Sequence, residues 1–189
     1  MKKGLIVLIA IVGIVVVIGM ALAGSYNGLV EKQNEVEGKQ AEIATQLQRR
    51  ADLIPNFVAT VKGYADYEQS TLTAVTEARS RVAAAGDDAA AQTAASEQLD
   101  RAISVWVNAV TEAYPDLKAN TQFVALQDEL AGTENRVAKA RDGYNAAAKD
   151  YNTAIRKFPQ NLIAGMFGFE KADYFEAAAG TESAPTVSF

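Results

Sequence analysis

An uncharged apolar stretch lies close to the N-terminus and restricts the folds that this chain can adopt. Residues 4–24 read GLIVLIAIVGIVVVIGMALAG and carry no charged side chain. A helix needs about 20 apolar residues to cross about 30 Å of hydrocarbon, so this stretch is long enough to span a lipid bilayer. We therefore expect a short cytoplasmic N-terminus of residues 1–3 and a transmembrane helix at 4–24.

A cleaved secretory signal peptide is the alternative interpretation of the same stretch. Ala21-Leu22-Ala23 has the small-x-small form of a cleavage site, and Lys2 and Lys3 supply a basic region in front of it. The apolar run is longer than the roughly 7–15 residues usual in a signal peptide, which favours an uncleaved anchor. Lys2 and Lys3 also predict that the N-terminus stays in the cytoplasm and that the soluble domain lies outside.

Helical periodicity fills the rest of the chain, where apolar residues recur every three or four positions and no alternating strand pattern occurs. The first run starts at Tyr26 and keeps its phase across Pro55, so we expect one bent helix that continues to about Ala84. A second helix is predicted at 89–113 and a third with a seam from Phe123 to Phe158, before Pro159. The buried seam of the third helix is expected to contain Phe123, Leu130, Val137, Tyr144, Tyr151 and Phe158.

The predicted fold is therefore all-α, with a single N-terminal transmembrane helix followed by an elongated antiparallel bundle. Three long helices and a short C-terminal helical element make up the bundle domain at 25–176, and a flexible tail is expected at 177–189.

Two absences restrict the chemistry. The 189 residues include no histidine and no cysteine, which excludes Ser-His-Asp triads, thiolate nucleophiles and the common zinc sites. We therefore expect no enzyme activity, no metal and no cofactor. The net charge is −5, with acidic and basic residues interspersed, so nucleic acid is not an expected partner either.

A polar string precedes Pro55 and has two interpretations. Arg49, Arg50 and Asp52 could form a docking site at the bend of the helix. They could instead satisfy backbone groups near the proline and pair with acids on a neighbouring helix. A second charge-dense stretch, from Glu129 to Asp142, is typical of a solvated helix face.

An apolar segment follows Pro159. Its large side chains are Leu162, Ile163, Met166, Phe167 and Phe169, and Tyr174 and Phe175 follow a few residues later. Such a segment packs on its own bundle, contacts another chain or meets lipid, because it leaves too little polar surface for a solvated helix. With three helices the third one leads away from the membrane, so the segment is expected far from the bilayer. Lipid is not expected to be available at the distance from the bilayer that the predicted path gives.

Several strings, taken in order, resemble the LemA family of bacteria. They include QLQRRADLIPNFVATVKGYA (46–65), YPDLKAN (114–120) and LQDELAGTENRVAKARDGYNAAAKDYNTAIRKFP (126–159). Two positions depart from the family pattern: Gln40 stands where tryptophan is usual, and Tyr67 stands where histidine is usual. The resemblance implies a membrane-anchored helical bundle of the bacterial envelope, without an established enzymatic activity. Family members are often encoded beside a TPM-domain protein or an HtpX-type membrane protease.

These observations predict a non-enzymatic scaffold or interaction protein that is anchored in the bacterial plasma membrane by residues 4–24. Long helices with thin apolar seams bury more surface by packing beside copies of themselves, so a homo-oligomer is expected. The alternative is an accessory subunit or adaptor of a membrane protease or a TPM-domain partner. Both functions depend on binding.

Overall fold

The computed structural model describes residues 2–62, 69–86 and 88–175. Within them the chain forms helices and no strand, so the predicted all-α fold is confirmed. The elements, in chain order, are α1 (Lys2–Lys62), α2 (Gln69–Ala84), α3 (Ala89–Ala113), a 3-10 helix η1 (Pro115–Ala119), α4 (Thr121–Ala154) and α5 (Gln160–Phe167). Tyr67 and the predicted tail at 177–189 lie outside the described residues.

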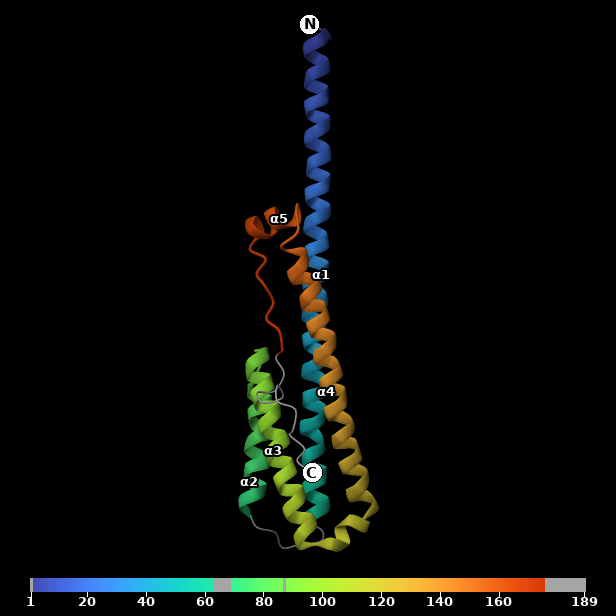
Figure 1. Ribbon diagram of the computed structural model, residues 1–189, viewed down its shortest axis with the longest axis vertical. Helices are drawn as coiled ribbons and strands as arrows, with labels where there is room; N and C mark the ends of the chain where they lie inside the picture. The colour runs from blue at the N-terminus through green and yellow to red at the C-terminus, as the bar shows by residue number, and fades with distance from the viewer. Residues whose placement is uncertain (1, 63–68, 87, 176–189) are drawn as a thin grey trace, which may run out of the picture. The chain divides into compact units, whose positions relative to one another are not determined.

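Helices α1 and α2 replace the single helix predicted from Tyr26 to Ala84. Helix α1 continues through Pro55 and ends at Lys62. Nη2 of Arg79 on α2 lies 3.9 Å from Oδ1 of Asp52 on α1, whereas one straight helix would separate these residues by about 40 Å. Helix α2 is therefore antiparallel to α1 (Figure 1). The single-helix prediction is wrong because the three- and four-residue spacing of apolar residues continues from α1 into α2. This spacing alone does not reveal that the chain reverses direction.

The contacts divide the chain into two compact units. The bundle unit consists of residues 40–143 with Tyr174 and Phe175, and the anchor unit consists of residues 1–39 and 144–173. In the bundle unit, the end of α1, α2, α3 and the start of α4 lie side by side, and successive helices are antiparallel (Figure 1).

Apolar residues from all of these helices form the core of the bundle unit. The ring of Phe57 lies at its centre, with centroids 5.1 Å from Trp106 and 4.9 Å from Phe123. The buried members of this core are Ile54, Phe57, Val61, Val75, Ala78, Leu99, Ile103, Trp106, Val110, Leu117, Phe123 and Leu130. Their spacing of three and four along each helix is the spacing that the sequence shows.

Short polar signals fix where α3 and α4 begin. Gly86 has a φ of 55°, which glycine adopts at little cost, and the Asp88 side chain then accepts a 2.9 Å hydrogen bond from the backbone N–H of Ala91. The Asn120 side chain accepts an equivalent 2.9 Å bond from the N–H of Phe123. These caps satisfy donors that a helix start leaves open, so the reversal on each side of α3 is specified locally.

The anchor unit contains the start of α1, the end of α4 and α5. Its small core consists of Leu29, Ala154, Ile163 and Ala164. The segment after α5 is held against α4 by Asn152, whose side chain donates to the carbonyl of Ala172 at 2.8 Å and accepts from its N–H at 2.9 Å. The hydroxyl of Tyr144 donates to the carbonyl of Asp173 at 3.0 Å.

The seam of α4 ends earlier than predicted. Phe123, Leu130, Val137, Tyr144 and Tyr151 are all buried. Phe158 is 79% exposed, and its assignment to the seam is wrong because α4 ends at Ala154 and the helical phase stops there.

The apolar segment after Pro159 also lies elsewhere than expected. The ring of Phe167 on α5 is 4.9 Å from the ring of Tyr26, only two residues beyond the apolar stretch that ends at Gly24. The expectation that 162–169 lies far from the predicted span is therefore wrong. The prediction counted three long antiparallel helices, whereas the described part of the chain has four, because α2 is separate from α1. With four antiparallel helices the end of α4 returns to the start of α1.

Candidate functional site

Arg50 is the centre of a charged layer inside the bundle unit. Its side chain is buried, with 4% of its surface exposed, and it joins three helices. Nη1 of Arg50 lies 2.6 Å from Oδ1 of Asp100 on α3, and Nη2 lies 3.4 Å from Oε2 of Glu134 on α4. A buried cation is tolerated only when anions and hydrogen-bond acceptors surround it, so these two carboxylates define the place of Arg50 in the core.

Burial shifts the pKa of Asp100 in this layer and of Arg141 beside it. It raises the pKa of the Asp100 carboxyl; Arg50 opposes the rise and Glu134 adds to it. Burial also lowers the pKa of the neighbouring Arg141 guanidinium, although Asp100 favours its charged form. Within the described part of the chain, Nε and Nη2 of Arg141 are buried and make no hydrogen bond. The layer is thus an internal set of charges in which desolvation outweighs pairing for Asp100 and Arg141.

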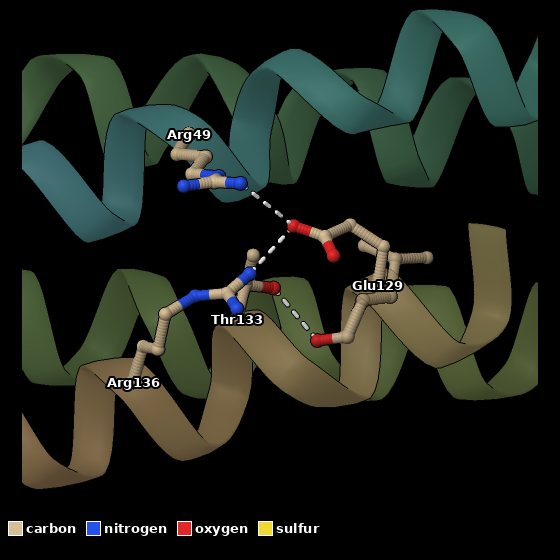
Figure 2. A network of polar contacts seen from close by, with 5 residues as sticks. Arg49, Glu129, Thr133 and Arg136 are labelled. Carbon is tan, nitrogen blue, oxygen red and sulfur yellow. Dashed lines mark hydrogen bonds and ion pairs between the residues drawn. The ribbon is translucent and has the colours of Figure 1, made fainter. Parts of the chain in front are cut away.

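A second set of charges, in which Arg49 is exposed and Glu129 and Arg136 are half-buried, joins α1 and α4 (Figure 2). Oε1 of Glu129 accepts hydrogen bonds from Nη2 of Arg49 at 3.1 Å and from Nη2 of Arg136 at 2.6 Å, which links α1 to α4. Below it, the buried hydroxyl of Thr133 donates to the carbonyl of Leu130 at 2.7 Å. The Arg49–Glu129 pair is exposed, and pairs of this kind contribute between about 0 and 1 kcal/mol, whereas the Glu129–Arg136 pair is half-buried.

The polar string before Pro55 divides between these two environments. Arg50 belongs to the core, where it pairs with acids on neighbouring helices. Arg49 and Asp52 are 59% and 58% exposed at their side chains, and they border a shallow open groove of about 730 Å³. Side chains of α1 alone line this groove: Ala44, Thr45, Gln48, Arg49, Asp52, Leu53 and Asn56.

The predicted C-terminal interaction residues also divide between core and surface. Ile163 is 2% exposed and packs in the anchor unit, and Phe169 is partly buried beside Tyr26. Leu162, Met166 and Phe167 are 53%, 76% and 60% exposed. We call these three exposed residues the α5 patch: Leu162 and Met166 share one flank of the helix, and Phe167 lies on the flank that meets Tyr26.

Tyr174 and Phe175 belong to the bundle unit. Phe175 is buried, and the Arg141 guanidinium carbon lies 5.6 Å from the centroid of its ring. Tyr174 is 39% exposed. Phe175 is therefore a packing residue, and the structure does not bring it together with the α5 patch in one unit.

Sequence reasoning missed Asp100 and expected Glu134 and Arg141 on a solvated face; Glu134 is 62% exposed, as expected, whereas Arg141 is half-buried. A signal was present at Arg50, because a charged residue within an apolar seam requires an oppositely charged partner. The identity of that partner depends on how α3 and α4 are placed against α1, which the spacing along one helix does not reveal.

The fold defines a class of protein: an antiparallel helical bundle whose N-terminal helix is long and apolar enough to cross a membrane. The chain belongs to the LemA family, which matches it over residues 39–189.

Relatives cover most of this chain at low identity. The magnetosome protein MamQ 2 of Paramagnetospirillum magneticum is 27% identical over 176 residues, which include 80% of this chain and 64% of the relative. The protein LemA of Metamycoplasma hominis is 26% identical over 155 residues, covering 82% of this chain and 70% of the relative. MamQ of Magnetospirillum gryphiswaldense is 25% identical, covering 82% and 66%. The chain thus spans about two thirds of the length of these relatives.

Proposed function

We propose that this chain is a non-enzymatic, membrane-anchored interaction protein of the bacterial envelope that associates with copies of itself. The observation that carries this proposal is the open flank of α1 in the bundle unit, where Arg49 and Asp52 are exposed on one side of one helix. The relatives' names state no reaction and no substrate.

The start of α1 supports the anchoring part of the proposal. Its most apolar window has a mean hydropathy of 3.3, and none of that window is buried by the rest of the chain. The large apolar side chains from Leu5 to Met20 are all more than half exposed. A contiguous apolar surface of this size requires lipid or protein around it, and its length fits a bilayer.

The charged layer supports binding over catalysis. Arg50 uses its charge within the core, and Arg49 and Arg136 share Glu129 at the surface. Acid-base catalysis needs a titratable group that meets a substrate with a matched pKa. Burial raises the pKa of the Asp100 carboxyl, but the group close to it is Arg50 of the same chain. The packing of three helices therefore accounts for this raised pKa without a catalytic role.

The groove on α1 supports self-association. Arg49 and Asp52 are three residues apart and therefore lie on the same face of the helix. A face that carries both signs of charge is complementary to itself when a second copy is related by a twofold axis, because each Arg49 then meets the other Asp52. Ala44 and Thr45 on the same face are small and allow a neighbouring helix to approach closely. Chains held in one membrane also meet already aligned, which lowers the entropy lost on association.

A cross-linking experiment tests the proposal. Because the sequence contains no cysteine, each cysteine variant carries a single thiol. Thr45→Cys places a thiol on the groove. Thr76→Cys is the matched control on α2, because both threonines are exposed and both hydroxyls donate to the carbonyl four residues earlier. We expect oxidation of membranes to give a disulfide-linked dimer for Thr45→Cys and little for Thr76→Cys.

Equal, weak cross-linking of the two variants would contradict self-association through this groove. If the protein from native membranes then co-purified at fixed stoichiometry with a membrane protease or a TPM-domain protein, the chain would instead be an accessory subunit. That complex would be expected to disappear when residues 162–176 are deleted.

A further inference from the structure

We propose that α5 lies in the membrane interface, with the α5 patch of Leu162, Met166 and Phe167 inserted between the headgroups and the upper acyl chains of the lipids. This inference rests on the proposed anchoring of the chain by residues 4–24. It adds a second, separate lipid contact to that anchor.

Helix α5 has three distinct flanks. Ile163 and Ala164 are buried against Leu29 and Ala154 in the anchor unit. Leu162 and Met166 are four residues apart, so they share a second flank, which is exposed. A third flank carries Asn161, which is exposed and polar. Because successive residues are turned by about 100°, Asn161 does not share the flank of its neighbour Leu162.

The position of α5 indicates what covers the exposed flank. The ring of Tyr26 is 4.9 Å from Phe167 and 5.7 Å from Phe169, so α5 meets α1 directly after the apolar stretch ends at Gly24. Tyrosine is enriched at this level of membrane proteins, where one end of the ring contacts lipid and the hydroxyl contacts water.

The direction of α5 also fits a position at the membrane interface. Within the anchor unit, α5 lies crosswise to α1 (Figure 1). If residues 4–24 cross the bilayer, α5 lies along its surface. Helices of this kind bury their apolar flank in the headgroup region to a depth of about 5–10 Å.

The chain around α5 extends the patch and closes it with a turn. Residues 158–169 contain no charged side chain, and Phe158 is 79% exposed. Gly168 has a φ of 74°, and the N–H of Phe169 donates to the carbonyl of Ala164 at 3.0 Å, which ends α5 and directs Phe169 toward Tyr26. Arg156 and Lys157, both exposed, precede the patch and suit anionic headgroups.

Lipid accounts for the patch better than another protein does, because the patch adjoins a surface that is already apolar. The side chains of α1 from Leu5 to Met20 are exposed in the same unit, and Leu22 and Tyr26 continue that surface up to α5. One bilayer covers both surfaces without a second binding partner.

Spin-label accessibility in the full-length protein tests this inference. Single cysteines are placed at Leu162 and Met166, with Asn161→Cys as the polar-flank control and Ile11→Cys as the reporter of the anchor. Each variant is labelled with a nitroxide and reconstituted in nanodiscs of phosphatidylcholine and phosphatidylglycerol. Collisions with oxygen, which concentrates in lipid, are compared with collisions with a water-soluble nickel chelate.

We expect labels at 162 and 166 to be several-fold less accessible to nickel than the label at 161, with oxygen accessibility raised. A lipid signature at Ile11 together with nickel accessibility at 162 and 166 equal to that at 161 would overturn the inference while leaving the anchor intact. Protection of 162 and 166 from both reagents would also overturn it, because a protein surface would then cover the patch. Nickel accessibility at Ile11 would refute the anchor itself.

Discussion

Nη1 of Arg50 lies 2.6 Å from Oδ1 of Asp100, and this ion pair joins α1 to α3 within the core of the bundle unit. Its neighbour in sequence, Arg49, is 59% exposed at its side chain and pairs with Glu129 at the surface. Two adjacent arginines on one helix thus occupy opposite environments, which provides a matched test of what burial adds to an ion pair.

Arg50→Met should destabilise the bundle by about 3–5 kcal/mol, because it leaves Asp100 charged, partly buried and without its cation. Arg49→Met should cost less than about 1 kcal/mol, as exposed pairs do. Urea unfolding of the full-length protein in nanodiscs measures both. Trp106 is the only tryptophan and is 2% exposed in the core, so its fluorescence reports on this unit. Equal effects of the two substitutions would show that Arg50 is not a core residue.

Asp100 should make the stability of the bundle depend on pH. Burial raises the pKa of its carboxyl above the ordinary value of 3.8, so the folded protein binds this proton more tightly than the unfolded chain. The contribution of Asp100 to the free energy of unfolding is therefore full below pH 3.8 and is lost as the pH rises through the folded pKa. The stability of the wild type relative to Asp100→Asn should fall over this window. A difference that rises with pH would mean that pairing with Arg50 outweighs burial.

Tyr144 and Tyr151 should both be core residues of the α4 seam. Replacing either with alanine should cost about 3–5 kcal/mol, as large truncations in packed cores do. Tyr144→Phe should cost about 0.5–1.5 kcal/mol through the lost bond to the carbonyl of Asp173. Phe158→Ala is the exposed control and should change stability by no more than about 0.5 kcal/mol. Thermal loss of helical circular dichroism measures all four, and unchanged melting of both tyrosine-to-alanine variants would place the seam elsewhere.

The charges of the α1 groove should act as a pair between two copies. Arg49→Glu alone and Asp52→Lys alone each make the face carry one sign, so each should weaken self-association. The double variant restores complementarity and should recover it. Analytical ultracentrifugation in detergent measures the three proteins against wild type. A double variant as weak as the single ones would rule out the twofold contact.

The sequence predicted those parts of the fold that depend on local pattern. The spacing of Leu130, Val137 and Tyr144 along α4 is helical, and helical spacing is enough to identify a buried stripe. The start of α3 was also predictable, because Gly86 and Asp88 are local signals for a turn and a cap.

The path of the chain was not predictable in the same way. The apolar phase continues from α1 into α2, so the reversal between Lys62 and Gln69 has no counterpart in the phase. One missed reversal changes the direction of every later helix, which is why α5 was expected far from Tyr26 and is found against it. The partners of Arg50 were unpredictable for a related reason, since Asp100 and Glu134 become its neighbours only when three helices are packed together.

Self-association of the protein can be tested by the mass of its assembly in native membranes. The full-length protein is extracted with a polymer that forms nanodiscs from the surrounding membrane, and its particles are measured by native mass spectrometry. A chain of 20.1 kDa should be found as a homo-oligomer of two or more copies that retains bound lipid. Particles that contain one chain only, or one chain with a different protein at fixed stoichiometry, would contradict the account.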